Sequence, residues 1–201
     1  MRRPGMYGGE SFLLQHLSEL AFIDQAEQVF ESERKDLEKR GAYTATGIGG
    51  AFGLITGVCN GYSDEVASVI AEIAYRMGYL KLEGALSQAE YIELRNGLRK
   101  RCRQRDWTLT EIQSEYGKAS WRAKRSNLLY PCSLAYGSVE RRDRWVFFDF
   151  WNEIVFTEDR HPIGKYGDVP MLRNVRVPAA TFKREFTFTP FGRRLLKEHA
   201  K

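Results

Sequence analysis

The residues SLAYGS (133–138) and WVFFDFW (145–151) decide the fold class, because they are rich in aromatic and β-branched side chains and predict two strands. The polar residues VERRDR (139–144) lie between them and predict the turn of a β-hairpin. The second strand alternates only in part between apolar and polar residues, which indicates that both faces of its sheet are buried.

Downstream of the hairpin, the pattern remains mixed. Residues 161–170, HPIGKYGDVP, are typical of a loop, whereas MLRNVRV (171–177) and TFKREFTFT (181–189) predict strands. Thr189 and Pro190 then suit the start of a closing helix, PFGRRLLKEHA.

Upstream of the hairpin, helical signals dominate. Apolar residues at helical spacing predict one long helix or two stacked helices over 11–40, and another over 63–77. Ser87 with Glu90, and Thr108 with Glu111, form capping boxes that open two more helices. We expect a core that includes Val69, Ile70, Ile73, Leu94, Leu98, Phe148 and Phe150.

These patterns predict an α+β fold with a helical N-terminal half and a mixed C-terminal half. We expect a helical region over 1–86 and a basic α+β region over 87–201, or one continuous domain, because nothing near residues 78–87 has the composition of a flexible linker.

Residues 43–62 carry no charge, and Gly49, Gly53, Gly57 and Gly61 recur at intervals of four. On a helix they would form a smooth strip that another backbone can approach closely. A tightly packed helix, or a glycine-rich loop followed by a helix, fits this window better than a membrane span, because its apolarity is only moderate.

Charge divides the chain unevenly. Residues 1–100 carry 11 basic and 14 acidic side chains, a net charge of −3, whereas residues 101–201 carry 20 and 12, a net charge of +8. Such asymmetry is typical of a polyanion-binding half, although a solvated basic surface produces the same numbers.

The cysteines and histidines suggest neither a disulfide framework nor a metal site. Cys59, Cys102 and Cys132 are widely spaced, and the three histidines are scattered. With no apolar signal segment behind Arg2 and Arg3, the expectation is a cytoplasmic protein without a cofactor.

The stretch LRKRCRQRDW (98–107) places five cations within seven residues, more than the C-terminal dipole of a helix requires. The elements around it resemble a winged helix-turn-helix in their order. Residues 108–116 would be its first helix, SWRAKRSN (120–127) its recognition helix and the hairpin turn its wing. The resemblance implies base contacts from Arg122 and Asn127 and phosphate contacts from the other cations.

Residues RRPGMYGG (2–9) resemble a stretch of the ATPase domains of type II topoisomerases. The resemblance implies a nucleotide-binding α/β sandwich, but the DxGxG signature of that family is absent from this chain.

Other enzyme signatures, including the P-loop and GxSxG, are also absent. Asp149 and Glu153, with His161 nearby, could serve as acid and base. A carboxylate paired with a neighbouring arginine is the more common arrangement.

The sequence therefore favours a non-enzymatic nucleic-acid-binding protein, with a protein-interaction or inhibitor module as the alternative and an enzyme with an unrecognised site as a third reading. DNA and RNA both stay open as ligands. The predicted contact residues are Arg99, Lys100, Arg101, Arg103, Arg105, Lys118, Arg122, Lys124, Arg125, Asn127, Arg141, Arg142 and Arg144.

Overall fold

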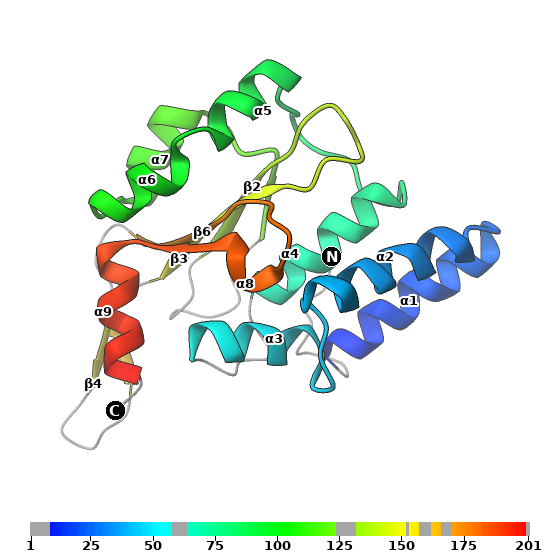
Figure 1. Cartoon of the computed structure of the whole chain (residues 1–201), viewed down its shortest axis with the longest axis horizontal. Coiled ribbons are helices and arrows are strands. Elements are labelled where there is room, and N and C mark those ends of the chain that lie inside the picture. The colour runs from blue at the N-terminus through cyan, green and yellow to red at the C-terminus, as the bar shows by residue number, and fades with distance from the viewer. Residues whose placement is uncertain are drawn as a thin grey trace.

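A five-stranded antiparallel sheet lies at the centre of the computed structural model, which describes residues 9–57, 64–123, 132–151, 153–156, 162–165 and 170–199. The strand order is β1-β2-β3-β6-β7; the central strands β2, β3 and β6 are labelled in Figure 1. The strands are β1 (Trp121–Arg122), β2 (Cys132–Tyr136), β3 (Val146–Trp151), β6 (Met171–Arg176) and β7 (Phe186–Phe188). A separate antiparallel pair consists of β4 (Glu153–Phe156) and β5 (Pro162–Lys165).

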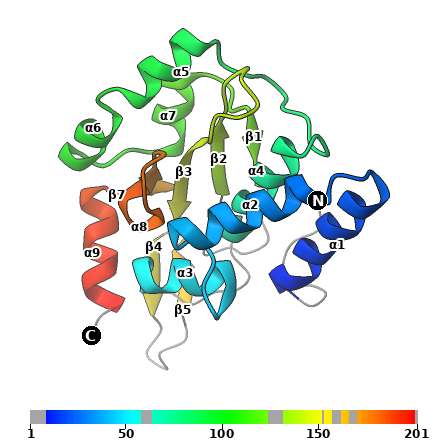
Figure 2. The same cartoon turned by 45° about the vertical axis from the view of Figure 1, so that its right-hand side comes forward.

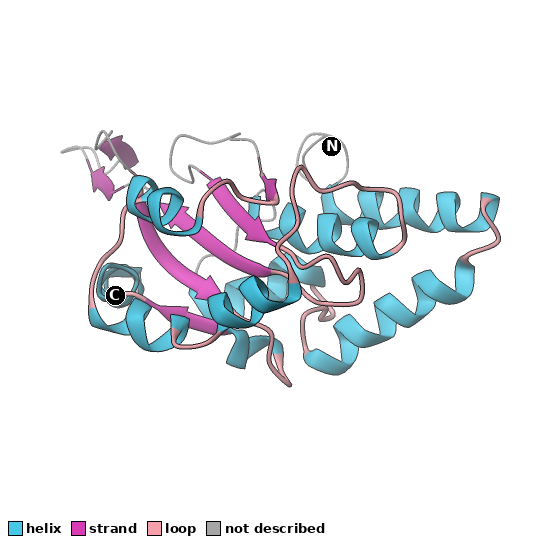
Figure 3. Cartoon of the chain, turned by 90° about the horizontal axis from the view of Figure 1, so that it is seen from above, coloured by secondary structure: helices cyan, strands magenta, loops and turns pink. Residues whose placement is uncertain are grey.

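Helices cover both faces of this sheet, as the views from the side and from above show (Figures 2 and 3). One face packs against α1 (Gly9–Ile23), α2 (Glu27–Arg40), α3 (Gly47–Thr56) and α4 (Asp64–Arg76). The other packs against α5 (Gln88–Arg95), α6 (Leu98–Gln104) and α7 (Leu109–Tyr116). The short α8 (Phe182–Glu185) precedes β7, and α9 (Pro190–His199) packs beside β6 and β7. The fold class is α+β, as the sequence predicts.

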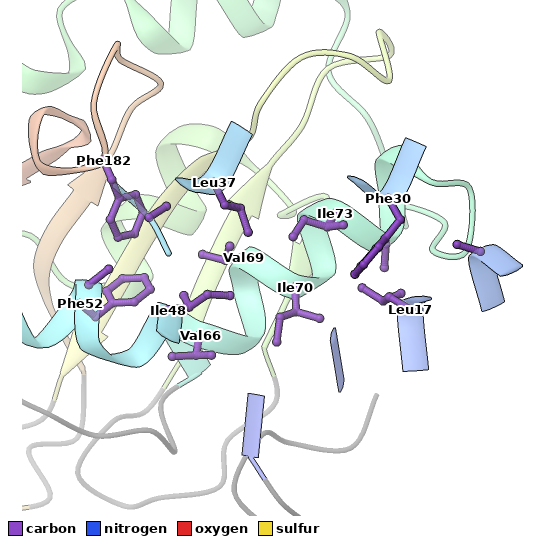
Figure 4. Close-up of a cluster of buried hydrophobic side chains, with 14 of the residues drawn as sticks. Leu17, Phe30, Leu37, Ile48, Phe52, Val66, Val69, Ile70, Ile73 and Phe182 are labelled. Carbon is purple, nitrogen blue, oxygen red and sulfur yellow. The ribbon is translucent and has the colours of Figure 1, made fainter. Parts of the chain in front are cut away.

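The predicted core residues are all buried. Val69, Ile70 and Ile73 of α4 pack with side chains from α1, α2 and α3 (Figure 4). Leu94, Leu98, Phe148 and Phe150 belong to the cluster on the opposite face. A third cluster joins Ala71 and Tyr75 of α4 to Trp145 and Phe147, so α4 packs directly on the strands of the hairpin.

A β-bulge in β6 sets which side chains face which layer. Asp149 pairs with Asn174 and Phe150 with Leu172, so Arg173 has no opposite residue on β3. The extra residue lets Leu172 and Val175 both reach the α5–α7 layer, although their spacing is odd. Asn174 and Arg176 consequently face the same layer as Asp149.

A network of polar side chains is buried between α4 and the sheet. Asp149 accepts hydrogen bonds from Arg176 Nε at 2.9 Å, from Asn174 Nδ2 at 2.7 Å and from Ser133 Oγ at 2.7 Å. Arg176 also donates to Ser68 Oγ of α4 at 2.6 Å. The prediction that Asp149 is paired with an arginine is therefore confirmed.

Two further carboxylates enter this interface. Glu65 of α4 forms an ion pair with Arg173, and Glu72 accepts a hydrogen bond from the backbone nitrogen of Trp145 at 2.5 Å. Burial raises the pKa of Glu65, and the charge of Arg173 offsets this only in part. Glu65 of α4 and Asp149 of β3 are thus each paired with an arginine of β6.

Local sequence signals set most helix boundaries. Both predicted capping boxes are present at Ser87 and Thr108. Gly41 ends α2 with a φ of 74°, a left-handed conformation that favours glycine. The helix predicted over residues 87–105 is divided into α5 and α6 at Asn96 and Gly97, because Gly97 also has a positive φ. The segment over 11–40 forms two helices, α1 and α2.

The prediction of a recognition helix over residues 120–127 is wrong for its first residues. Trp121 and Arg122 form β1, which pairs with β2, because Trp121 packs 6.0 Å from the ring of Trp145 at the sheet edge. Lys124, Arg125 and Asn127 lie outside the described residues, as do residues 2–8 of the topoisomerase-like motif.

Three smaller expectations are corrected. Residues 162–165 form a strand rather than a loop, because they pair with β4. Residues 182–185 form the short helix α8, and only 186–188 continue as a strand. The glycine strip is not one helical face, since Gly57 has a φ of 71° and ends α3, while Gly61 is outside the described residues. Among the helices described, none combines the length and apolarity that crossing a membrane requires.

Replacement of Ile73, which is 1% exposed, tests the α4 core. Ile73→Ala should lower the free energy of unfolding by about 2–5 kcal/mol, because it removes buried methylenes and leaves a cavity. Leu54→Ala is the control, since Leu54 is 82% exposed, and it should change stability by less than about 0.5 kcal/mol. Urea unfolding measures both; equal effects would contradict the packing of α4.

Replacement of Asp149 tests the buried network. Asp149→Asn leaves Arg176 as an uncompensated buried cation, so it should cost about 3–5 kcal/mol in urea unfolding. The surface control Glu31→Gln, which removes the exposed partner of Arg34, should cost less than about 1 kcal/mol.

The ionised carboxylate of Asp149 also makes the stability of the fold depend on pH. Burial alone would raise the pKa of Asp149, but the charge and hydrogen bonds of Arg176 outweigh it, so the pKa lies below its ordinary value. The ionised carboxylate therefore stabilises the fold above the unfolded-state pKa of about 3.9, and this contribution is lost as pH falls through the lower folded-state pKa. Asp149→Asn should show a smaller loss of stability upon acidification than the parent; an equal loss would contradict the assignment.

Candidate nucleic-acid interface

Several of the predicted contact residues are ion-paired with carboxylates of their own neighbourhood. Arg101 pairs with Glu115 at 2.7 Å, and Arg105 pairs with Glu111 at 2.8 Å. Lys118 lies 3.0 Å from Glu83. These pairs connect α6 to α7 and the loop before α5 to the loop after α7, so most of their charge is balanced within the fold.

The hairpin turn does not present three equivalent cations. Arg144 pairs with Glu185 at 2.7 Å and donates to the carbonyl oxygen of Ala179. The guanidinium of Arg141 lies 5.4 Å from the ring centre of Tyr75, over the end of α4. Arg142 is exposed, and so is Arg122 on the edge strand β1.

Arg99 has a structural position on the opposite edge of the sheet. Its guanidinium donates to the carbonyl oxygen of Val177 at 2.6 Å, to that of Arg184 at 2.7 Å and to Thr187 Oγ1 at 3.2 Å. These bonds join α6 to α8 and β7. Figures 1 and 2 show α6, α8 and the N-terminal end of α9 gathered at this edge.

A second arginine completes the junction. Arg193 of α9 donates to the carbonyl oxygen of Arg103 at 3.1 Å and to that of Phe188 at 2.9 Å. Gly192 lets α9 approach β6 closely, because a Cβ atom there would lie 2.1 Å from the carbonyl oxygen of Arg173. The helix is therefore held with its first turn beside α6.

The junction concentrates positive charge. Burial lowers the pKa of Arg99, and the charges of Arg103 and Arg95 lower it further, while the charge of Glu185 raises it. We name this region the arginine surface. We define it as those cations of α6, α8, the end of α5 and the start of α9 that form no ion pair in the described chain, namely Arg95, Arg99, Lys100, Arg103, Lys183, Arg184 and Arg193.

No member of the arginine surface forms an ion pair with a carboxylate in the described part of the chain. Two acidic side chains lie near this surface. Glu185 is buried and pairs with Arg40 and Arg144, and Asp106 pairs with Arg194 of α9 at 3.1 Å. Burial raises the pKa of Glu185, and the charges of Arg40 and Arg144 oppose this rise. The members of the surface thus lack the direct ion pairs found at Arg101, Arg105 and Arg194.

Sequence reasoning included Arg99, Lys100 and Arg103 but missed the members from α5, α8 and α9. The sequence does indicate that Arg193 is unusual, because it lies near the N-terminal end of α9, where the helix dipole disfavours cations. Its placement beside α6 depends on the sheet and could not be read from the local sequence.

A cavity of about 280 Å³ lies between α5, α6 and α7 and has a different character. Glu90, Glu93 and Glu115 line it together with Arg101 and Tyr116, so acidic side chains outnumber the cation. An anionic ligand fits the arginine surface better than this cavity. Among the described residues, no cluster of histidine, cysteine and acidic side chains could hold a metal ion.

Replacement of Arg99 should separate a structural role from a binding role. Arg99→Ala should lower the free energy of unfolding by about 1–3 kcal/mol, since it leaves carbonyl oxygens of the junction without their donor. Arg103→Ala removes an exposed side chain and should change stability by less than about 0.5 kcal/mol. Thermal unfolding measures both, and equal losses would contradict the anchoring role of Arg99.

No model of a known protein family, no curated protein and no solved structure matches the chain.

Proposed function

We propose that the protein binds the phosphate backbone of a nucleic acid through the arginine surface, without catalysing a reaction. The observation that carries the proposal is the cluster of cations on α6, α8 and α9 without carboxylate partners in the described chain. Like charges held together repel one another, and a polyanion relieves that repulsion while releasing its counterions.

The form of the surface favours phosphate contacts over base recognition. Its cations come from the end of α5, from α6 and α8, and from the start of α9, rather than from one helix inserted in a groove. We therefore expect binding that depends weakly on base sequence. Duplex DNA and single-stranded nucleic acids are both candidate ligands.

The cysteines suit a reducing compartment, and we propose a cytoplasmic location on this ground. Cys102 is buried and forms no disulfide. Burial raises the pKa of Cys102 to about 12, so its thiol stays protonated and unreactive at neutral pH.

A salt titration tests the proposed function. Fluorescence anisotropy with labelled duplex and single-stranded oligonucleotides should show an affinity that falls linearly on a log–log plot as salt rises. Arg103→Ala with Arg184→Ala should flatten the slope by roughly 2 for a duplex, because two phosphate contacts are lost. The loss should be similar for unrelated base sequences.

The matched control removes two exposed cations near the β1 edge of the sheet, Lys81→Ala with Arg122→Ala. This variant loses the same net charge at the sheet edge opposite β7 and should keep the slope of the parent. Equal weakening by both double variants, or no binding at micromolar protein near 50 mM salt, would sink the proposal.

A further inference from the structure

Helix α1 exposes an unusual amount of apolar surface. Of the eight large hydrophobic side chains that are exposed in the described chain, four lie on α1, namely Phe12, Leu20, Phe22 and Ile23. Phe22 and Ile23 are each 71% exposed. Several exposed large apolar residues on one helix are typical of an interaction surface.

The inner face of α1 is already used for the core. Leu17 and Ala21 are buried against the side chains of α2, α3 and α4. Figures 1 and 2 show α1 at the outer edge of the molecule, with its far side turned away from the sheet. The exposed residues therefore belong to a second apolar face, which the described chain leaves uncovered.

The outward face has the spacing of a helix–helix seam. Phe12, His16, Glu19 and Ile23 follow one another at intervals of four, three and four residues, the heptad spacing that keeps side chains along one contact line. His16 and Glu19 occupy the middle of this seam, 3.1 Å apart within the helix, and each is about half exposed. Phe12 and Ile23 occupy its two ends.

We propose that this face pairs with the same face of a second copy of the chain, with the two α1 helices antiparallel about a two-fold axis. Along the seam the order is an apolar residue, a histidine, a glutamate and an apolar residue. When the partner helix runs in the opposite direction, each histidine therefore meets a glutamate. His16 of one protomer then faces the partner's Glu19, and Phe12 faces the partner's Ile23. A two-fold axis forms both contacts twice, as an isologous interface requires.

A hollow beside the seam fits this arrangement. Gln15, Ser18, Glu19, Phe22 and Ile23 line it. Because the partner's Phe12 lies opposite Ile23, its ring can enter the hollow and cover the exposed ring of Phe22. The parallel alternative would place Glu19 against the partner's Glu19, which like-charge repulsion disfavours.

The small area of the α1 surface limits the expected affinity of the dimer. A four-turn helix pair buries less than a standard interface of about 1,600 Å², so we expect a reversible dimer with a dissociation constant of about 1–100 µM. The arginine surface lies at the far side of the molecule from α1 in Figures 1 and 2, so dimerisation would leave it accessible on both protomers. The inference does not depend on the proposed function.

Sedimentation velocity on the full chain, from about 1 to 200 µM, tests for the dimer. The parent should shift from monomer to dimer across this range. Ile23→Lys should raise the dissociation constant by at least about tenfold, since it places a charge in the apolar end of the seam. Leu54→Lys is the matched control, because Leu54 is exposed on α3, and it should dimerise as the parent does.

A charge exchange tests the antiparallel register. His16→Glu places carboxylates opposite the partner's Glu19, so this variant should dimerise about tenfold more weakly than the parent. Glu19→Lys removes the carboxylate that faces the partner's His16 and should also weaken the dimer. An equimolar mixture of the two should form a heterodimer, because the introduced carboxylate then faces the introduced ammonium group. Both positions are exposed, and circular dichroism verifies that the helices are retained.

A parent chain that stays monomeric at the highest concentration would overturn the proposal. So would a dimer that Ile23→Lys leaves intact, which would place the interface elsewhere. A mixture of the two charge variants that forms no heterodimer would refute the antiparallel register.

Discussion

The buried ion pair between Asp149 and Arg176 joins the layers of this protein. The carboxylate accepts hydrogen bonds from two strands besides its own, and the guanidinium reaches Ser68 of α4. A buried charge without its partner would be very costly, so the pair constrains both the register of β2, β3 and β6 and the position of α4 on the sheet. The bulge at Arg173 belongs to the same constraint, because it turns Asn174 and Arg176 toward Asp149 while Leu172 and Val175 face the other layer.

The candidate site depends on that arrangement. Once β6 is fixed, β7 pairs with it, and Gly192 allows α9 to lie against the backbone of β6. Arg99 and Arg193 then donate to carbonyl oxygens across the junction of α6, α8 and α9. These contacts hold cations from three parts of the sequence at one edge. The nearby carboxylate of Glu185 forms its ion pairs with Arg40 and Arg144, and its charge raises the pKa of Arg99.

Sequence patterns were sufficient where the determining forces are local. The capping boxes at Ser87 and Thr108, the apolar stripe of α4 and the hairpin strands all follow from neighbours a few residues apart. The pairing of Asp149 with an arginine was also expected, but sequence could not identify Arg176, which is 27 residues away.

Predictions failed where a distant element decides the outcome. Trp121 follows a helix and precedes a basic stretch, which suggested a recognition helix, but the β2 edge and the ring of Trp145 hold it in a strand. For the candidate site, the sequence identified Arg99, Lys100 and Arg103 on α6. It could not show that Glu115 and Glu111 balance Arg101 and Arg105, or that Arg184 and Arg193 lie beside α6, because both depend on tertiary packing.

We propose that an anionic chain binds at the junction of α6, α8 and α9. The most direct measurement is an NMR titration of the isotope-labelled protein with a short unlabelled oligonucleotide, followed through backbone amide and arginine side-chain signals. The account predicts that the largest shifts occur at Arg103, Arg184 and Arg193, with little change at Arg101 and Arg105, which are already paired. Shifts confined to the hairpin turn at 139–144, or none at saturating oligonucleotide, would contradict it.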